Sequence, residues 1–247
     1  MVDAVTPPFG GPTPTATRAP TPTPAHTATY TLTPAPLSSP TPTPTHTLTP
    51  SPSPTAGEAE TIITLQQESN GYWGSEDTYI YQYAPNANYC RQELLRVGYK
   101  QQYAGLLHFD LSSVPSNAVV TQATLQLYAA GWGGSNVTIG AYCVMRGVNI
   151  CQATWNQAQS GDAWSQPGGN DTTTDRRGSA ESSVITNGIG RWYTFDLTAA
   201  VQGWLDGSLA NNGVLLRAAY SSSSFSFASA QNGTVSLHPR LTIKYRQ

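Results

Sequence analysis

The chain is poor in charged residues, and this shortage excludes two classes of partner. Only 11% of its 247 residues are charged, the formal net charge is −2, and no run of lysine or arginine occurs. Binding to nucleic acid or to an anionic membrane surface needs concentrated positive charge, so neither partner is expected. No apolar run approaches the roughly 18 residues that a spanning helix requires, so no membrane span is predicted.

Cysteine is also scarce, which limits metal and disulfide chemistry. The three cysteines are Cys90, Cys143 and Cys151, and one of them stays unpaired in any connectivity. No CxxC motif occurs and no histidine lies near them at zinc-site spacing, so a zinc site is not expected. Two interpretations stay open: a disulfide between Cys143 and Cys151, which would form outside the cell, or three buried thiols.

Histidine is too rare to support many catalytic arrangements. Of the four histidines, His26 and His46 lie in the first fifty residues and His238 precedes Pro239, whereas His108 lies in a predicted strand, where the alternation turns it away from its apolar neighbours. The motifs GxSxG and HExxH and a phosphate-binding loop are absent. Asp77, Asp110 and Asp196 could in principle form a glycosidase pair. The last two, however, occur in Phe-Asp-Leu-Ser/Thr, where a carboxylate accepts turn or cap hydrogen bonds. No catalytic residue is therefore predicted, and the chain is not expected to be an enzyme.

One weak metal candidate remains in the loops. Glu76 and Asp77, with Asn86 and Asn88, supply the oxygen atoms that calcium prefers. No Asp-x-Asp loop supports the site, so calcium at Asp77 is the only cofactor hypothesis that the sequence offers, and no other cofactor is expected.

Proline is abundant, but almost only at the start of the chain. Fifteen of the 19 prolines precede Ala56, alternating with threonine and serine. Proline favours polyproline II geometry, so residues 1–57 are predicted to be an extended Thr/Pro-rich stalk. Its composition also matches O-glycosylated spacers, although an unmodified disordered linker is the alternative. The O-glycan candidates are Thr13, Thr15, Thr21, Thr23, Thr41, Thr43, Thr45, Thr49, Ser51 and Ser53.

The stalk contains one segment with a strand pattern. Between two copies of a twenty-residue repeat, the proline-free stretch 25–33 alternates threonine with His26, Ala28, Tyr30 and Leu32. A period of two places these four side chains on one face and threonines on the other. A lone strand must pair with a sheet edge, its own or a neighbour's, so the segment is a candidate for linking subunits. Chance variation in a repetitive sequence is the alternative.

Residues 58–247 are predicted to form one all-β domain. Ten short runs rich in Val, Ile, Thr and aromatic residues are separated by turn signals. The amphipathic helices that a parallel sheet would need are missing, which favours a jelly-roll-like two-sheet sandwich. One short helix is expected at 199–205, capped by Thr198, and a long polar loop at 161–190. The predicted strands are 61–65, 77–83, 94–97, 105–111, 119–129, 137–145, 191–197, 213–218, 225–228 and 240–245.

Several motifs of this domain occur in an order typical of a known family. They are Gly105-Leu-Leu-His-Phe-Asp-Leu-Ser-Ser-Val-Pro115, Ala123-Thr-Leu-Gln-Leu-Tyr128, Ala153-Thr-Trp-Asn156, Phe195-Asp-Leu-Thr198, Val201-Gln-Gly-Trp-Leu205 and Pro239-Arg-Leu-Thr-Ile-Lys-Tyr245. Together they resemble the DNRLRE-type, or disaggregatase-related, module of secreted prokaryotic surface proteins and polysaccharide-active enzymes. The resemblance covers nearly all of residues 61–247.

The resemblance implies a jelly-roll-like sandwich, an extracellular or cell-surface setting and a link to carbohydrate binding. It brings no catalytic residues. One departure is local: where the family often has Trp-x-Glu before the Ala-Thr-Trp-Asn element, this chain has Val148-Asn-Ile-Cys151. That difference puts any role of the acidic position in doubt and favours a local disulfide.

Sugar binding would use exposed aromatic faces with polar neighbours. Tyr72, Trp73, Trp132 and Trp164 lie in glycine-rich or polar segments and are the candidate contacts, whereas the other three tryptophans, Trp155, Trp192 and Trp204, are expected in the core.

Two functions follow from these observations. The first is a non-enzymatic structural subunit of a surface filament, a homopolymer in which residues 25–33 link neighbouring copies. The alternative is a carbohydrate-binding module displayed on a glycosylated stalk.

Overall fold

The computed structural model describes residues 59–247. The proposed linking strand, with His26, Ala28, Tyr30 and Leu32, and the O-glycan candidates between Thr13 and Ser53 lie outside the described residues. Within residues 59–247, no helix is long and apolar enough to cross a membrane.

The described residues are almost entirely β-structure, which confirms the predicted all-β class with one short α-helix. All ten predicted strands are present, with ends that differ by a few residues. The strands are β1 (Thr61–Gln66), β2 (Ser75–Tyr81), β3 (Leu94–Gly98), β4 (Tyr103–Phe109), β5 (Val119–Gly133), β6 (Val137–Cys143), β7 (Gln157–Gln159), β8 (Asp162–Ala163), β9 (Ser182–Thr186), β10 (Arg191–Asp196), β11 (Val214–Ala218), β12 (Ser224–Ala228) and β13 (Arg240–Arg246). The helix α1 is Thr198–Leu205, and a 3-10 turn, η1, covers Val235–Leu237.

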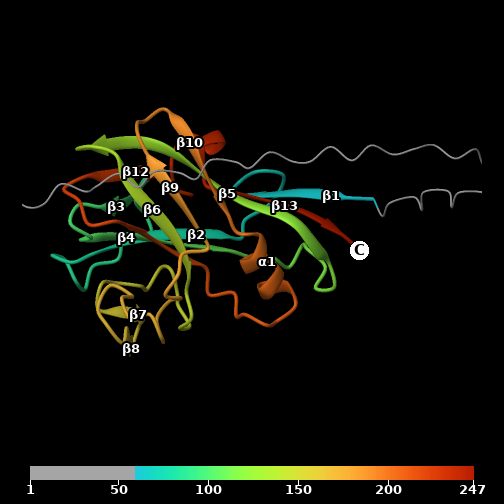
Figure 1. Cartoon of the computed structure of the whole chain (residues 1–247), viewed down its shortest axis with the longest axis horizontal. Coiled ribbons are helices and arrows are strands. Elements are labelled where there is room, and N and C mark those ends of the chain that lie inside the picture. The colour runs from blue at the N-terminus through green and yellow to red at the C-terminus, as the bar shows by residue number, and fades with distance from the viewer. Residues whose placement is uncertain (1–58) are drawn as a thin grey trace, which may run out of the picture. The chain divides into compact units, whose positions relative to one another are not determined.

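Eleven strands form one antiparallel sheet that curls into two layers (Figure 1). The 15-residue β5 belongs to the first layer, where it pairs with β13, β10 and β12. Strands β3 and β4 pair only at Gly98 and Tyr103, so the sheet folds over at this point. Beyond it, β4 pairs with β2 and β11, and β6 and β9 complete the second layer.

The core lies between the two layers because the apolar side chains alternate along each strand. Leu125 and Leu127 of β5, Val97 of β3 and Leu216 of β11 are all buried in one cluster. Gly105 of β4 lies directly over the facing strand, since a Cβ atom there would meet Leu95 at 3.2 Å. The two layers are therefore in close contact at the position where the sheet turns over.

The second layer is covered on its outer face as well. Leu106 and Leu215 point away from the main core and pack against Trp155 and Trp164 in a smaller second cluster. The segment 144–176, which includes the small sheet of β7 and β8, forms this cover (Figure 1). Leu106 and Leu215 are thus buried on the outer face of the second layer, whereas the outer face of the first layer carries mainly polar side chains, such as Thr124, Thr242 and Lys244.

Two predictions about local structure are wrong. The polar segment 161–190 is not one long loop, because β9 pairs there with β6 as an edge strand. Thr198 does not cap α1 with its side chain. Instead, its backbone N–H and hydroxyl both donate to Oδ1 of Asp196, at 2.9 and 2.6 Å. The carboxylate therefore organises the turn into the helix, and these hydrogen bonds hold the pKa of Asp196 below its usual value.

Candidate functional site

The two exposed tryptophans that the sequence singled out lie at opposite ends of the sandwich. Trp73 precedes β2 and is 69% exposed, beside the residues that follow β4. Trp132 lies near the end of β5 and is 45% exposed, beside the start of β12. The register from β2 through β4 and β3 to β12 places these two ends a full strand length apart. They cannot contribute to one compact site.

The other two predicted aromatic contacts are less available to a ligand. Tyr72 is half-buried, and its hydroxyl donates to the backbone carbonyl of Asp110 at 3.1 Å. The prediction that Trp164 is an exposed loop residue is wrong. Only 4% of it is exposed, and its indole Nε1 donates to the carbonyl of Thr154 at 2.9 Å. The neighbouring backbone N–H of Ser165 is held by the buried carboxylate of Asp175, which draws the segment down onto the sheet.

Of the three tryptophans expected in the core, two pack against it and one does not. Trp155 is buried in the second cluster, as predicted, and Trp204 packs at the margin of the main core. Trp192 lies on the outer face of the first layer, where the guanidinium of Arg240 is 4.2 Å from its ring centroid. Gln126 accepts a 2.8 Å hydrogen bond from Nε of that arginine.

A surface that the sequence did not predict contains five tyrosines in successive ring contact, which we call the tyrosine row. Its members are Tyr89, Tyr79, Tyr103, Tyr81 and Tyr83. The rings of Tyr89 and Tyr79 are stacked, as are those of Tyr103 and Tyr81, with centroids 4.2 Å apart in both pairs. Tyr79 meets Tyr103 edge-to-face, and Tyr81 meets Tyr83 in the same way, with ring centroids 5.9 Å apart in both pairs. Tyr79 is buried, Tyr89, Tyr103 and Tyr81 are half-buried, and Tyr83 is exposed.

Strand geometry explains why these rings meet. Tyr79 and Tyr81 are two residues apart on β2 and so point to the same side. Tyr103 of β4 is the register partner of Tyr81, which brings their rings together across the strands. Tyr89 comes from the loop between β2 and β3, and its backbone N–H donates to the hydroxyl of Thr78 at 3.2 Å.

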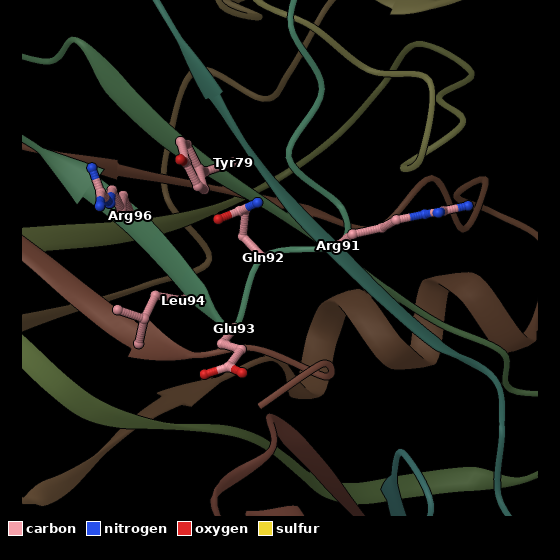
Figure 2. A pocket seen from close by; sticks show the side chains of 6 residues that line it. All are labelled: Tyr79, Arg91, Gln92, Glu93, Leu94 and Arg96. Carbon is pink, nitrogen blue, oxygen red and sulfur yellow. The ribbon is translucent and has the colours of Figure 1, made fainter. Parts of the chain in front are cut away.

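Two cavities flank the tyrosine row, and Arg96 lines both. The first has a volume of about 420 Å³ and is lined by Tyr79, Arg96, Gln92 and their neighbours. Figure 2 shows the side chain of Gln92 near Tyr79, with Glu93 pointing away from Tyr79 and Arg91 extending outward. The second cavity, of about 300 Å³, is lined by Tyr103, Tyr99, Arg96 and two serines of β12. The guanidinium of Arg96 lies 5.8 Å from the Tyr79 ring centroid, in cation–π contact.

Two tyrosine hydroxyls of the row, those of Tyr79 and Tyr81, have a raised pKa and are neutral at neutral pH. Burial raises the pKa of Tyr79 above its ordinary value of 10, and the nearby charge of Arg96 offsets only part of that increase. The hydroxyl of Tyr103 raises the pKa of Tyr81 in the same direction. The row therefore presents apolar ring faces and hydroxyls that both donate and accept hydrogen bonds.

A disulfide lies directly behind this surface, and it corrects the predicted pairing. Cys90 is bonded to Cys151, whereas Cys143 is a buried thiol, so the predicted bond between Cys143 and Cys151 is wrong. Cys143 ends β6 with its side chain in the main core, whereas Cys151 lies in the cover of the second layer. Burial raises the pKa of Cys143 to about 12.

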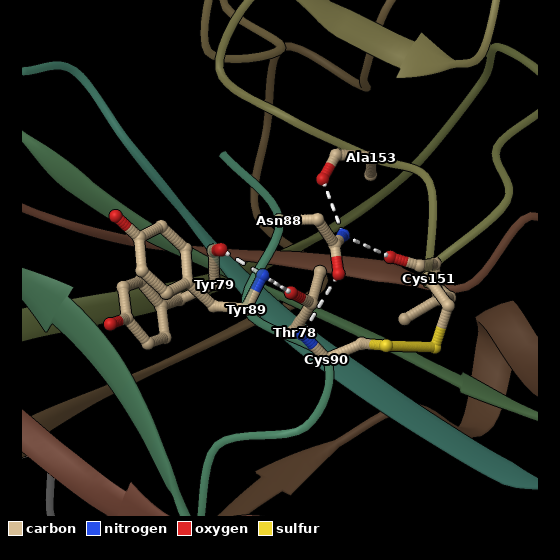
Figure 3. The surroundings of a disulfide bond; sticks show 8 residues. Thr78, Tyr79, Asn88, Tyr89, Cys90, Cys151 and Ala153 are labelled. Carbon is tan, nitrogen blue, oxygen red and sulfur yellow. Dashed lines mark hydrogen bonds between the residues drawn. A yellow bond between two sulfur atoms is a disulfide. The ribbon is translucent and has the colours of Figure 1, made fainter. Parts of the chain in front are cut away.

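The disulfide and one asparagine together anchor the loop that carries Tyr89. Figure 3 shows Asn88 between Tyr89 and the segment around Cys151. Its side-chain amide donates to the carbonyls of Ile150 and Ala153 at 3.0 and 2.6 Å. Its Oδ1 accepts from the backbone N–H of Cys90 at 2.9 Å. These bonds hold the loop in place where Tyr89 stacks on Tyr79.

Asp77, the calcium candidate, is buried beneath the same loop. Only 2% of it is exposed, and the backbone N–H of Ala230 donates to its Oδ2 at 2.7 Å. Burial raises the pKa of Asp77 to about 7. The asparagines proposed as co-ligands bond elsewhere: Asn86 accepts from Asn156, and Asn88 bonds to the cover. The structure thus does not bring the proposed calcium ligands together, and no cluster of three acidic, histidine or cysteine side chains suited to a metal occurs within residues 59–247.

Asp110 and His238 make structural hydrogen bonds, and His108 lies within β4. Asp110 accepts from the backbone N–H and hydroxyl of Ser112 at 2.9 and 2.8 Å, as its motif predicts. His108 is half-exposed and lies opposite Glu76 across the strands. His238 is buried with its two ring nitrogens at 3.1 and 2.6 Å from the backbone carbonyls of Gln67 and Asn232.

A two-layer β-sandwich that carries a row of aromatic rings beside cationic and amide side chains has the architecture of a carbohydrate-binding module. Comparison with family models gives the same class. Residues 70–245 match the model of Carbohydrate-binding module family 96, and the chain belongs to this family. Comparison with curated proteins gives no match.

Proposed function

We propose that the module binds a polysaccharide along the tyrosine row, with Arg96 and Gln92 as polar contacts. The observation that carries this proposal is the continuous ring contact from Tyr89 to Tyr83 beside two cavities that share Arg96. Family membership supports carbohydrate as the ligand class. The row is our choice of site because exposed tryptophans elsewhere are isolated from one another.

The chemistry of the row suits sugar rings. The C–H groups of a sugar pack on aromatic faces, while its hydroxyls need donors and acceptors at the rim. The tyrosine hydroxyls, the amide of Gln92 and the guanidinium of Arg96 provide these within one surface. Because five rings follow one another, the ligand we propose is a chain of several sugar units rather than a single sugar. No step of bond cleavage is assigned to these residues.

The setting we propose is extracellular. The Cys90–Cys151 disulfide favours an oxidising compartment, and the Thr/Pro-rich segment fits a glycosylated stalk that holds the module away from its attachment. The resemblance to DNRLRE-type modules of secreted surface proteins supports the same setting. The sequence favoured a filament subunit, with a carbohydrate-binding module on a stalk as the alternative. Here we propose the binding module as the principal function.

Affinity electrophoresis first identifies a polysaccharide that retains the native chain. The proposal predicts that Tyr81→Ala weakens binding to this polysaccharide. We expect a loss of about tenfold, because one stacked ring is removed from the row. Tyr81→Phe keeps the ring and should retain most of the affinity. A panel of neutral and charged polysaccharides, run with the full chain, identifies the ligand first.

Trp73→Ala is the matched control, since it removes an aromatic side chain that is more exposed than Tyr81 at the far end of the sandwich. It should leave retention unchanged. If Trp73→Ala abolishes retention and Tyr81→Ala does not, the tyrosine row is not the site.

A further inference from the structure

Strand β1 is an edge strand of the first layer, and one of its sides has backbone groups that no other strand pairs with within residues 59–247. Its other side pairs with β13 from Thr61 to Gln66. In an antiparallel strand every second residue points its backbone N–H and C=O away from the partner. Natural proteins usually cover or block such edges, since an open edge recruits another strand.

The sequence of β1 lacks the charges and prolines that commonly block an edge. Ile62 is 61% exposed, and Ile63 is only partly buried at the margin of the core. Beside the strand lies a cavity of about 370 Å³, lined by Ile63, Leu65, Tyr72 and Ser113 among others. The edge thus offers both backbone partners and an apolar recess for side chains.

The two faces of β1 differ in a way that defines what could extend the sheet. On the inner face, Ile63 and Leu65 continue the apolar core. On the outer face, Thr64 is hydrogen-bonded to Thr242 of β13 (Oγ1 to Oγ1, 3.1 Å), and Thr242 is the register partner of Thr124. A strand added at this edge should therefore be apolar on one face and threonine-rich on the other.

Residues 25–33 have this pattern. The side chains of His26, Ala28, Tyr30 and Leu32 alternate with threonines at 27, 29, 31 and 33. Placed beside β1, the threonine face would continue the outer row, because threonine pairs well with threonine across strands. Tyr30 and Leu32 would then face the recess on the inner side.

We propose that residues 25–33 of one copy of the chain add as a strand to the free edge of β1 in a second copy. The spacer between the two elements favours a second copy over the same chain. Residues 34–56 contain eight prolines and would extend about 70 Å as polyproline II, several times the length of β1. Such a stiff spacer resists the sharp reversal that pairing within one chain requires. Because donor and edge are different surfaces, the contact is head-to-tail and repeats from copy to copy.

The proposal is independent of sugar binding and is tested by the association state of the full chain. Sedimentation velocity from micromolar to submillimolar concentration should show concentration-dependent association beyond a dimer. Thr31→Pro removes a backbone donor from the middle of the added strand and should weaken association at least about tenfold. Thr45→Pro is the matched control, because it makes the same change within the repeat outside residues 25–33, and it should associate like the native chain.

A mixing experiment tests the direction of the contact. Ser113→Tyr fills the recess beside β1 from a neighbouring exposed loop and should also prevent association when tested alone. In a mixture of the two variants, the Ser113→Tyr chain still has an intact donor strand and the Thr31→Pro chain still has an open β1 edge. One contact can therefore form between them, so the mixture should form dimers and nothing larger. A native chain that stays monomeric throughout, a Thr31→Pro chain that associates normally, or a mixture that stays monomeric would each overturn the proposal.

Discussion

Among single residues, burial decides the chemistry of the aspartates more than their sequence motifs do. Asp77 lies within β2 and is buried with one backbone donor, whereas Asp110 follows β4 and is exposed with two hydrogen bonds from Ser112. Burial raises the pKa of Asp77 to about 7, whereas the hydrogen bonds lower the pKa of Asp110. The sequence could predict the hydrogen bonds of Asp110 from its motif, but not the depth of Asp77.

Asp77→Asn is predicted to remove a pH dependence of stability. Between the unfolded pKa near 4 and the folded value of about 7, the folded state holds more protons than the unfolded state, so its stability falls as pH rises through this window. The loss amounts to roughly 4 kcal/mol at pH 8. The asparagine amide carries no charge and can still accept from the backbone N–H of Ala230, so the variant should be the more stable protein at pH 8. Urea unfolding at pH 5 and pH 8 measures the stability of both chains.

The control for this prediction is Asp110→Asn. The lowered pKa of Asp110 stabilises the fold above pH 4, so this variant should lose stability at neutral pH, the opposite sign. If Asp77→Asn unfolds at lower urea than the native chain at pH 8, burial of a charged Asp77 is not costly and this interpretation of the residue is wrong.

Among the secondary-structure elements, alternation was a good guide to the strands and a poor guide to the segments that cover them. All ten runs predicted as strands are strands. The segment 161–190 has little apolar periodicity because its order comes from polar contacts. Asp175, which is fully buried, accepts backbone N–H groups from Ser165, Gln166 and Asp171, and also Nε of Arg146 at 3.2 Å. These contacts join residues 4 to 29 positions apart without a regular period, so apolar alternation does not reveal them.

Asp175→Ala is predicted to loosen the cover of the second layer. It leaves three backbone donors and Nε of Arg146 without their acceptor, which should lower the free energy of unfolding by about 3 kcal/mol. Chemical denaturation measures the loss, and the near-ultraviolet circular dichroism of Trp155 and Trp164 should weaken with it. The same substitution at Asp171 is a fair comparison, because its partners Thr173 and Thr174 are exposed, and a much smaller loss is expected there.

In the molecule as a whole, the candidate site shows what the sequence could not indicate. Tyr79 and Tyr81 alternate visibly in one predicted strand, but Tyr89 and Tyr103 join them only through the loop anchor and the β2–β4 register. The disulfide behind the row closes a separation of 61 residues, so a local pairing was the wrong expectation. The tryptophans in glycine-rich segments were the obvious candidates, although the structure places them apart. The linking strand stays a prediction from its alternation, and β1 now offers a complementary edge on which to test it.

Hydrogen–deuterium exchange of the full chain, with and without its retained polysaccharide, tests most directly whether carbohydrate binds along the tyrosine row. The ligand should slow exchange in residues 79–83, 89–96 and 99–103, which carry the row and line its two cavities. Exchange near Trp73 and Trp132 should be unchanged. Protection confined to residues 71–74 or 130–135, with none along the row, would contradict this assignment of the binding site.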